Sequence, residues 1–106
     1  MDYIIILTTF PNKDEASKVA QCLLEARAVA CANIIDTISS RFWWQGKIDN
    51  ASETLLIAKT EKTYFSRVES IIKKHHSYDV PEIIALPILD GSKDYLDWIS
   101  ESIEKK

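Results

Sequence analysis

Two adjacent histidines, His75 and His76, are candidate metal ligands in this 106-residue chain. Imidazole nitrogen is a good ligand for copper, whereas magnesium and calcium prefer oxygen ligands. The pair continues the apolar stripe of Ile71 and Ile72 in four-residue steps, so it lies at the end of a predicted helix. Neighbouring helical residues point about 100° apart, so the two imidazoles do not chelate one ion as an i, i+4 pair would. Two explanations stay open: a metal site shared between subunits, or helix-end histidines that interact with the last carbonyls.

A second set of polar residues lies on or beside the predicted strands. Glu53 and Lys59 are six residues apart, so they share one face if their strand is regular. Tyr78 and Glu82 lie around the start of the last predicted strand, and Cys31 lies on the second. One interpretation is a pocket for a small polar or anionic ligand, in which Lys59 supplies the positive charge. The alternative is a structural network of ion pairs and hydrogen bonds.

The stretch RFWWQGK, residues 41–47, places three aromatic side chains just before a predicted tight turn at Gln45-Gly46. Neighbouring side chains on a strand point to opposite faces, so Trp43 faces one way while Phe42 and Trp44 face the other. A sheet with large aromatic side chains on both faces needs both faces covered. We expect Trp43 to cover the helix side of the sheet and Trp44 to contact another subunit.

Motifs of common enzyme classes are missing from the sequence. It has no glycine-rich phosphate loop and no nucleophile elbow, and neither Cys nor Ser is paired with His at a motif spacing. Some ferredoxin-like proteins hydrolyse acyl phosphates with a glycine-rich, arginine-bearing loop after the first strand. The corresponding loop, residues 9–13, has neither residue type. We therefore expect that the protein is not an enzyme and needs no organic cofactor.

The composition is that of one globular domain over residues 1–106, because 46% of the residues are hydrophobic. The net charge of −3 argues against a surface for nucleic acid or for an anionic membrane. The apolar run from Tyr3 to Leu7 is too short to span a membrane and follows no basic segment, so a cytoplasmic location is expected. Cys22 and Cys31 are then expected to be reduced, although the sequence leaves a disulfide between them open.

Hydrophobic periodicity predicts four strands and three helices. Asn12 with Glu15 is a helix N-terminal signal, Thr60 is a candidate cap for the second helix, and Gly91-Ser92 opens the last helix. Pro87 cannot donate to a strand ladder, so the fourth strand is expected at an edge or with a bulge. The expected strands are 3–9, 29–35 with its continuation 38–44 after a kink near 36–37, 53–60 and 82–89.

This order, βαββαβ followed by a helix, is that of the split-βαβ, ferredoxin-like fold, an α+β architecture. Such a fold packs both of its helices on one face of a four-stranded sheet, and the other face is bare in a monomer. The first strand is apolar at every central position, so the bare face would be an association surface. A second copy of the chain is the expected cover, and the long hairpin offers strand edges for pairing between subunits.

Five stretches of the sequence together resemble the CutA divalent-cation tolerance family over almost the whole chain. They are VACANI, FWWQGK, ETLLIAKT, YDVPEIIALPI and DYLDWI. The resemblance implies a ferredoxin-like homotrimer, similar in architecture to PII signalling proteins, and a link to copper and other divalent metals. It associates His75 and His76 with copper, along with a first-strand cysteine whose position is Thr8 here. It also implies clefts between subunits, for which the candidate residues are Cys31, Trp44, Glu53, Lys59, Tyr78, Glu82 and Tyr95.

Three functions are compatible with these patterns. The first is a homotrimer that binds copper or another divalent cation in metal tolerance. The second is a PII-like sensor whose intersubunit cleft binds a small polar or anionic ligand. The third is a structural or interaction trimer without a ligand. Trp44 and Tyr95 are expected in the core or an interface, with stacking against a ligand as the alternative.

Overall fold

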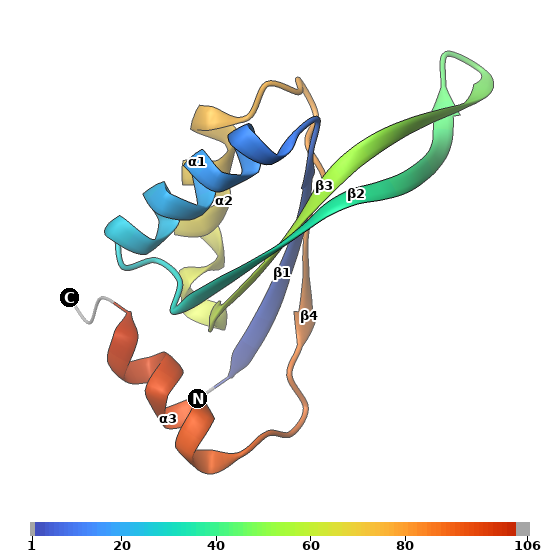
Figure 1. Ribbon diagram of the computed structural model, residues 1–106. Coiled ribbons are helices and arrows are strands. Elements are labelled where there is room, and N and C mark those ends of the chain that lie inside the picture. The colour runs from blue at the N-terminus through green and yellow to red at the C-terminus, as the bar shows by residue number, and fades with distance from the viewer. Residues whose placement is uncertain (1, 104–106) are drawn as a thin grey trace.

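Within residues 2–103, which the computed structural model describes, four antiparallel strands form one sheet in the order β2-β3-β1-β4 (Figure 1). The arrangement is βαββαβ with a C-terminal helix, so the predicted α+β, ferredoxin-like fold is confirmed. The elements are β1 (Tyr3–Phe10), α1 (Lys13–Glu25), β2 (Cys31–Trp44), β3 (Lys47–Glu61), a 3-10 turn (Lys62–Tyr64), α2 (Phe65–His75), β4 (Ile83–Pro87) and α3 (Lys93–Ser102).

One face of the sheet forms the hydrophobic core with α1 and α2, which lie side by side on that face in Figure 1. Side chains alternate between faces along a strand, and the even-numbered residues of β1, such as Ile4 and Ile6, point toward the helices and are buried. Leu23 of α1 and Ile72 of α2 are fully buried against them. The apolar stripes of the two helices therefore meet the apolar face of the sheet, as the periodicity predicts.

The opposite face of the sheet is apolar as well, and α1 and α2 do not cover it. Leu7 of β1 lies between Ile57 of β3 and Ile84 of β4 on this side. Ile84 and Leu86 are each 48% exposed, and Ile35 is 46% exposed. We call this surface the open face; its apolar side chains are Ile5, Leu7, Ile35, Leu55, Ile57, Ile84 and Leu86.

The strand β2 is continuous, but its pairing with β3 shifts between Ile35 and Ile38, where a kink was predicted. Thr37 has a positive φ of 61° at this point. The hairpin turn is also as predicted. Gln45 and Gly46 have positive φ of 52° and 76°, and they connect Trp44 of β2 to its partner Lys47 of β3. Pro87 ends the edge strand β4, which agrees with its inability to donate to a ladder.

Beyond the kink, residues 38–53 form a two-stranded arm that projects past the helices (Figure 1). The arm exists because β3 begins at Lys47, six residues before its predicted start. The expectation that Trp43 covers the helix side of the sheet is wrong. Trp43 is 74% exposed, because at that point the arm has passed beyond α1 and α2. Trp44, on the other side of the arm, is 60% exposed.

The helix α3 packs at the end of the sheet that carries the N-terminus of β1. Ser100 joins the two central strands there, because its hydroxyl donates to Glu61 Oε2 at 2.6 Å and lies 2.6 Å from the hydroxyl of Tyr3. Ile99 and Ile103 are buried beneath the helix.

The predicted cap at Thr60 is absent, because its hydroxyl donates to the carbonyl of Ala28 instead of capping α2. Ser92 directly precedes α3 as predicted, without a side-chain capping bond. Cys22 and Cys31 are both free thiols. Over residues 2–103, no helix has the length and the apolar character needed to cross a membrane.

Candidate functional site

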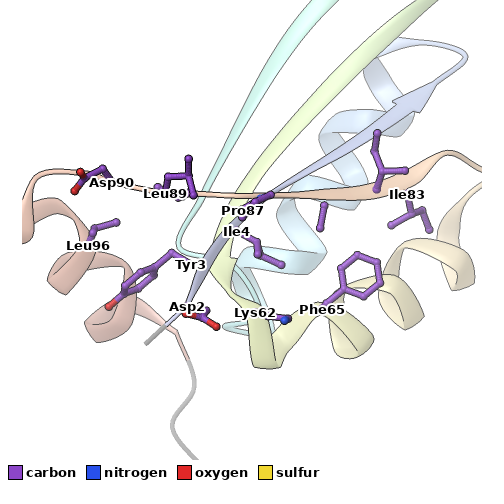
Figure 2. A pocket seen from close by; sticks show the side chains of 13 residues that line it. Asp2, Tyr3, Ile4, Lys62, Phe65, Ile83, Pro87, Leu89, Asp90 and Leu96 are labelled. Carbon is purple, nitrogen blue, oxygen red and sulfur yellow. The ribbon is translucent and has the colours of Figure 1, made fainter.

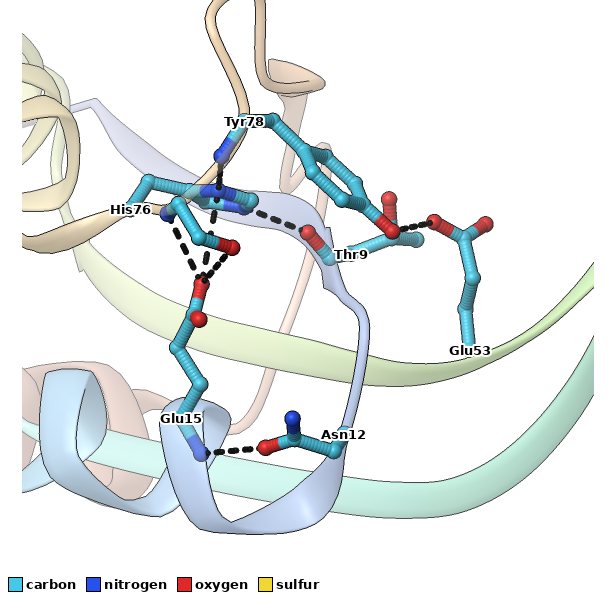
Figure 3. Close-up of polar contacts among 7 residues, drawn as sticks. Thr9, Asn12, Glu15, Glu53, His76 and Tyr78 are labelled. Carbon is cyan, nitrogen blue, oxygen red and sulfur yellow. Dashed lines mark hydrogen bonds and ion pairs between the residues drawn. The ribbon is translucent and has the colours of Figure 1, made fainter.

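His76 lies at the centre of a polar network between α1, β1 and the segment that follows α2 (Figure 3). Its side chain is fully buried and stacks on Phe10, with 4.4 Å between ring centroids. Nε2 lies 2.6 Å from the carbonyl oxygen of Thr9, and the backbone N–H of Tyr78 donates to Nδ1 at 3.1 Å. A carbonyl can only accept, so Nε2 carries the proton and Nδ1 is the acceptor. Two backbone groups thus specify a neutral imidazole in one tautomer.

Glu15 completes this network from the first turn of α1. Its Oε2 accepts hydrogen bonds from the backbone N–H and the hydroxyl of Ser77, and lies 3.5 Å from His76 Nδ1. The predicted helix signal is confirmed in part: Asn12 Oδ1 accepts the backbone N–H of Glu15 at 2.9 Å. The Glu15 side chain, however, binds Ser77 rather than returning to Asn12. The network therefore fastens the end of α2 to the start of α1.

The two histidines do not present free ligand atoms together. The lone pair of His76 Nδ1 already accepts a backbone N–H, whereas His75, the last residue of α2, is exposed. Thr8, at the position of the family's cysteine, is fully buried, and its hydroxyl has no hydrogen-bond partner. In the described part of the chain, no three His, Cys, Asp or Glu residues are grouped so that they could hold a metal ion.

A hollow of about 760 Å³ runs along the arm, from Glu53 at its base to Trp44 beside the turn, and meets this network at Tyr78. The Tyr78 hydroxyl donates to Glu53 Oε2 at 2.9 Å on its wall (Figure 3). Burial, the hydrogen bond to Glu53 and the negative charges of Glu53 and Glu15 raise the pKa of Tyr78 to about 12. Tyr78 therefore remains a neutral hydrogen-bond donor at physiological pH. The hollow is lined by Thr9, Ser40, Arg41, Phe42, Trp44, Asp49, Glu53, Tyr78, Asp79, Val80 and Glu82.

This hollow brings together four of the seven predicted cleft residues: Trp44, Glu53, Tyr78 and Glu82. The other three, Cys31, Lys59 and Tyr95, lie elsewhere. Lys59 shares a face with Glu53, as the parity of the strand predicts, but six strand residues separate the two by about 20 Å.

Lys59 belongs instead to the end of the sheet near α3. Its Nζ lies 5.8 Å from the centre of the Tyr95 ring, and Cys31 is its partner on β2. The Tyr95 ring in turn packs against Trp98, with 5.4 Å between ring centroids. The expected cation of the pocket is therefore absent from the hollow within one chain.

The hollow also contains residues that the sequence patterns did not single out. Asp49 and Asp79 join Glu53 and Glu82, so four carboxyl groups line it, against a single base, Arg41. Such a surface attracts cations and repels anions. The expectation of an anionic ligand is thus disfavoured for this hollow. No sequence signal marked Asp49 or Asp79, because the arm and the segment after α2 are far apart in the chain.

A second hollow, of about 930 Å³, lies along the free edge of β4 (Figure 2). Phe65 of α2, Ile83 and Pro87 of β4 and Leu96 of α3 line it. Leu89, on the connection from β4 to α3, is 95% exposed beside it. This hollow contains none of the predicted site residues, and it extends the apolar surface of the free β4 edge.

Comparison with known proteins assigns the family. Residues 4–102 match the family model described as "CutA1 divalent ion tolerance protein". The chain belongs to this family. It is 46% identical over 99 residues to the divalent-cation tolerance protein CutA of Archaeoglobus fulgidus, covering 93% of this chain and 96% of that protein. It is 39% identical to the chloroplastic CutA 1 of Oryza sativa, of whose length it spans 56%.

Solved CutA structures share the fold over nearly the full chain. CutA1 from Oryza sativa superposes with a TM-score of 0.96 at 37% identity, covering 100% of this chain and 97% of that one. The periplasmic divalent cation tolerance protein CutA from Archaeoglobus fulgidus gives a TM-score of 0.93 at 44% identity, covering 96% and 99%. The CutA fold of the single chain that the five sequence stretches imply is therefore confirmed.

Proposed function

We propose that this CutA-family chain acts in divalent-cation tolerance as a homotrimer that binds copper or another divalent cation between its subunits. The observation that carries the proposal is the open face, an apolar sheet surface that α1 and α2 leave uncovered. A continuous apolar face of this kind is normally an association surface. The cation part rests on the names of the relatives, which are divalent-cation tolerance proteins. The role is one of binding rather than catalysis.

A metal ion in this proposal takes ligands from more than one subunit. The described residues of one chain hold no group of three potential ligands, yet two partial sources exist. His75 offers an exposed imidazole at the end of α2, which suits copper. The hollow along the arm offers four carboxyl groups, which also suit harder cations. Assembly would bring such partial sets together.

Calorimetric titration with copper(II), zinc and magnesium salts tests the proposal. Wild type should bind copper more tightly than magnesium. The variant His75→Ala should weaken copper binding if the imidazole contributes, and Glu53→Gln should weaken it if the hollow contributes. Glu53→Gln keeps an oxygen that accepts the Tyr78 hydroxyl, so it changes charge more than shape.

His76→Ala is not a suitable ligand test, because it also removes two hydrogen bonds to backbone groups. Wild type that binds none of the three metals would contradict the cation part of the proposal and favour a structural or interaction trimer. Equal copper binding by wild type and both variants would place the site elsewhere.

A second candidate function is a PII-like sensor that binds a small ligand in the hollow. The hollow favours this candidate because Phe42, Trp44 and Tyr78 give it aromatic walls. Its four carboxyl groups favour a cationic or neutral polar ligand. A thermal-shift screen with small cations and anions would distinguish the cases, since a bound ligand raises the melting temperature by mass action.

A cytoplasmic location is part of the main proposal. The relatives include proteins named as chloroplastic and as periplasmic, so the family is not confined to one compartment. Fractionation of cells that express the natural gene would test the location.

A further inference from the structure

The kink in β2 is a one-residue β-bulge with a strained residue in it. Ile35 is opposite Leu55 and Ile38 is opposite Glu53, so β2 advances three residues where β3 advances two. Thr37, within the bulge, has a φ of 61°. This left-handed conformation is unusual for a β-branched residue, and in the type of bulge that contains a left-handed residue, that residue is usually glycine. The chain thus maintains a strained backbone at the point where the arm begins.

The extra residue is not needed to align the two strands. Before the bulge, Ile34 is opposite Leu56 on the helix side; after it, Trp44 is opposite Lys47 on the side of the open face. Removing one residue would leave both of these pairs in place and would put Asp36 opposite Thr54. The Thr54 hydroxyl already donates to Asp36 Oδ1 at 2.9 Å, so that pairing needs little adjustment. Alignment of the sheet therefore gives no reason for the strain.

What a bulge does change is direction, because the bulged strand bends and its local twist increases. The arm that starts here has exposed aromatic side chains on both of its sides, with Trp43 74% and Trp44 60% exposed. On the Trp44 side the arm continues the open face, since Trp44, Ser40 and Ile38 pair with odd-numbered residues of β3, as Ile35 does. The arm is thus an extension of the proposed subunit interface whose orientation depends on the bulge.

We infer that the bulge at Asp36-Thr37 is a positioning element, which aims the arm at a second copy of the chain at the expense of backbone strain in Thr37. The inference rests on the proposed self-association. Strained backbone positions persist where the surrounding structure holds them, and they cluster at functional sites. Here the function is the direction of the arm, and the surface that receives it belongs to another subunit.

Two variants separate the bulge from its strain. Deleting Thr37 removes the bulge but keeps every cross-strand pair of the arm in phase. Thr37→Gly keeps the bulge and relieves the strain, because glycine adopts a positive φ readily. We expect the deletion variant to fold and to associate more weakly than wild type, with a dissociation constant higher by about tenfold or more. We expect Thr37→Gly to associate as wild type does and to melt at a higher temperature.

Light scattering and sedimentation equilibrium give the association constants, and thermal unfolding gives the stability. A monomeric wild type would contradict both the proposed self-association and the inference. A wild-type oligomer with unchanged association in the deletion variant would overturn the inference alone. If the deletion of Thr37 prevents folding, deletion of Asp36 is the second variant, since it leaves Thr37 opposite Thr54. Failure of both to fold would show that the subunit itself needs the bulge and would overturn the inference.

Discussion

Two buried threonines on the helix side of the sheet differ in whether their hydroxyl is hydrogen-bonded. Thr8 and Thr60 are both fully buried, but the Thr60 hydroxyl donates to the Ala28 carbonyl at 2.7 Å and the Thr8 hydroxyl has no hydrogen-bond partner. A buried polar group without a partner lowers stability, whereas removing one member of a buried hydrogen bond leaves the other unsatisfied. The same substitution should therefore have opposite effects at the two positions.

We predict that Thr8→Val leaves the free energy of unfolding unchanged or raises it by about 1 kcal/mol, while Thr60→Val lowers it by about 1–3 kcal/mol. Urea denaturation of the two variants beside wild type measures both values. Each variant is the control for the other, because the change of side chain is the same. A similar loss of stability in both would mean that the Thr8 hydroxyl has a partner in solution.

The raised pKa of Tyr78 leads to a prediction about the stability of the protein at alkaline pH. This pKa is raised from 10.0 in the unfolded chain to about 12 in the folded chain, mainly by burial and by the hydrogen bond to Glu53. A raised pKa means that folding favours the protonated phenol, so the stabilisation is fully present below pH 10 and is lost as the pH rises toward 12. The unfolding free energy of wild type should therefore fall relative to that of Tyr78→Phe across this window.

Chemical denaturation of wild type and Tyr78→Phe at a series of pH values tests this prediction. Other tyrosines and the lysines titrate in the same range, and the difference between the two proteins cancels their contributions. Parallel curves above pH 10 would indicate that the phenol of Tyr78 titrates normally in the folded protein.

At the level of elements, two local signals in the sequence predicted the structure correctly, whereas one contact between distant residues was not predictable. The cap at Asn12 and the turn at Gln45-Gly46 were predictable, because each depends on neighbouring residues. The Glu15 side chain was not, since its partner Ser77 is 62 residues away. The start of β3 was predicted six residues too late because residues 47–52, KIDNAS, contain a single β-branched side chain, Ile48, and no aromatic one.

The candidate site shows the same limit. Strand parity correctly put Glu53 and Lys59 on one face, but sharing a face does not bring them together, since six residues of strand span about 20 Å. The two lie at opposite ends of β3, one beside Tyr78 and the other beside Tyr95. The hollow depends on the arm lying beside the segment after α2, and these two segments are far apart in the sequence and share no motif.

The exposure of the arm determines how replacing its two tryptophans with alanine should affect subunit stability and association. Because Trp43 and Trp44 are both mostly exposed, replacing either with alanine should change the unfolding free energy of an isolated subunit by no more than about 0.5 kcal/mol. In an assembly that buries Trp44 beside the open face, Trp44→Ala should weaken association by about 3–5 kcal/mol per site. Dilution experiments that combine light scattering with thermal unfolding separate the two effects. Dissociation by Trp43→Ala with an intact Trp44→Ala oligomer would reverse the assignment of the two sides.

The shape of the whole molecule bears on how copies would assemble. Besides the open face, the sheet has two free edges of different character, the long strand β2 and the five-residue strand β4. An edge that pairs with a copy of itself gives a two-fold dimer. Pairing of β2 with β4 of the next copy is heterologous, and such contacts either close into a ring or continue as a filament.

We predict a closed ring of three. Pairing β2 with the β4 edge of the next subunit would satisfy the backbone groups of β4 and of the part of β2 that lies opposite it, and a ring leaves no β4 edge free to aggregate. The same closure turns the open faces of three sheets toward a common axis, where their apolar side chains would be removed from water. Sedimentation equilibrium at micromolar concentration should therefore give three times the mass of the chain, independent of concentration. A mass that rises steadily with concentration would indicate an open filament, a mass of two chains would indicate that an edge pairs with itself, and a stable monomer would mean that the open face remains wet.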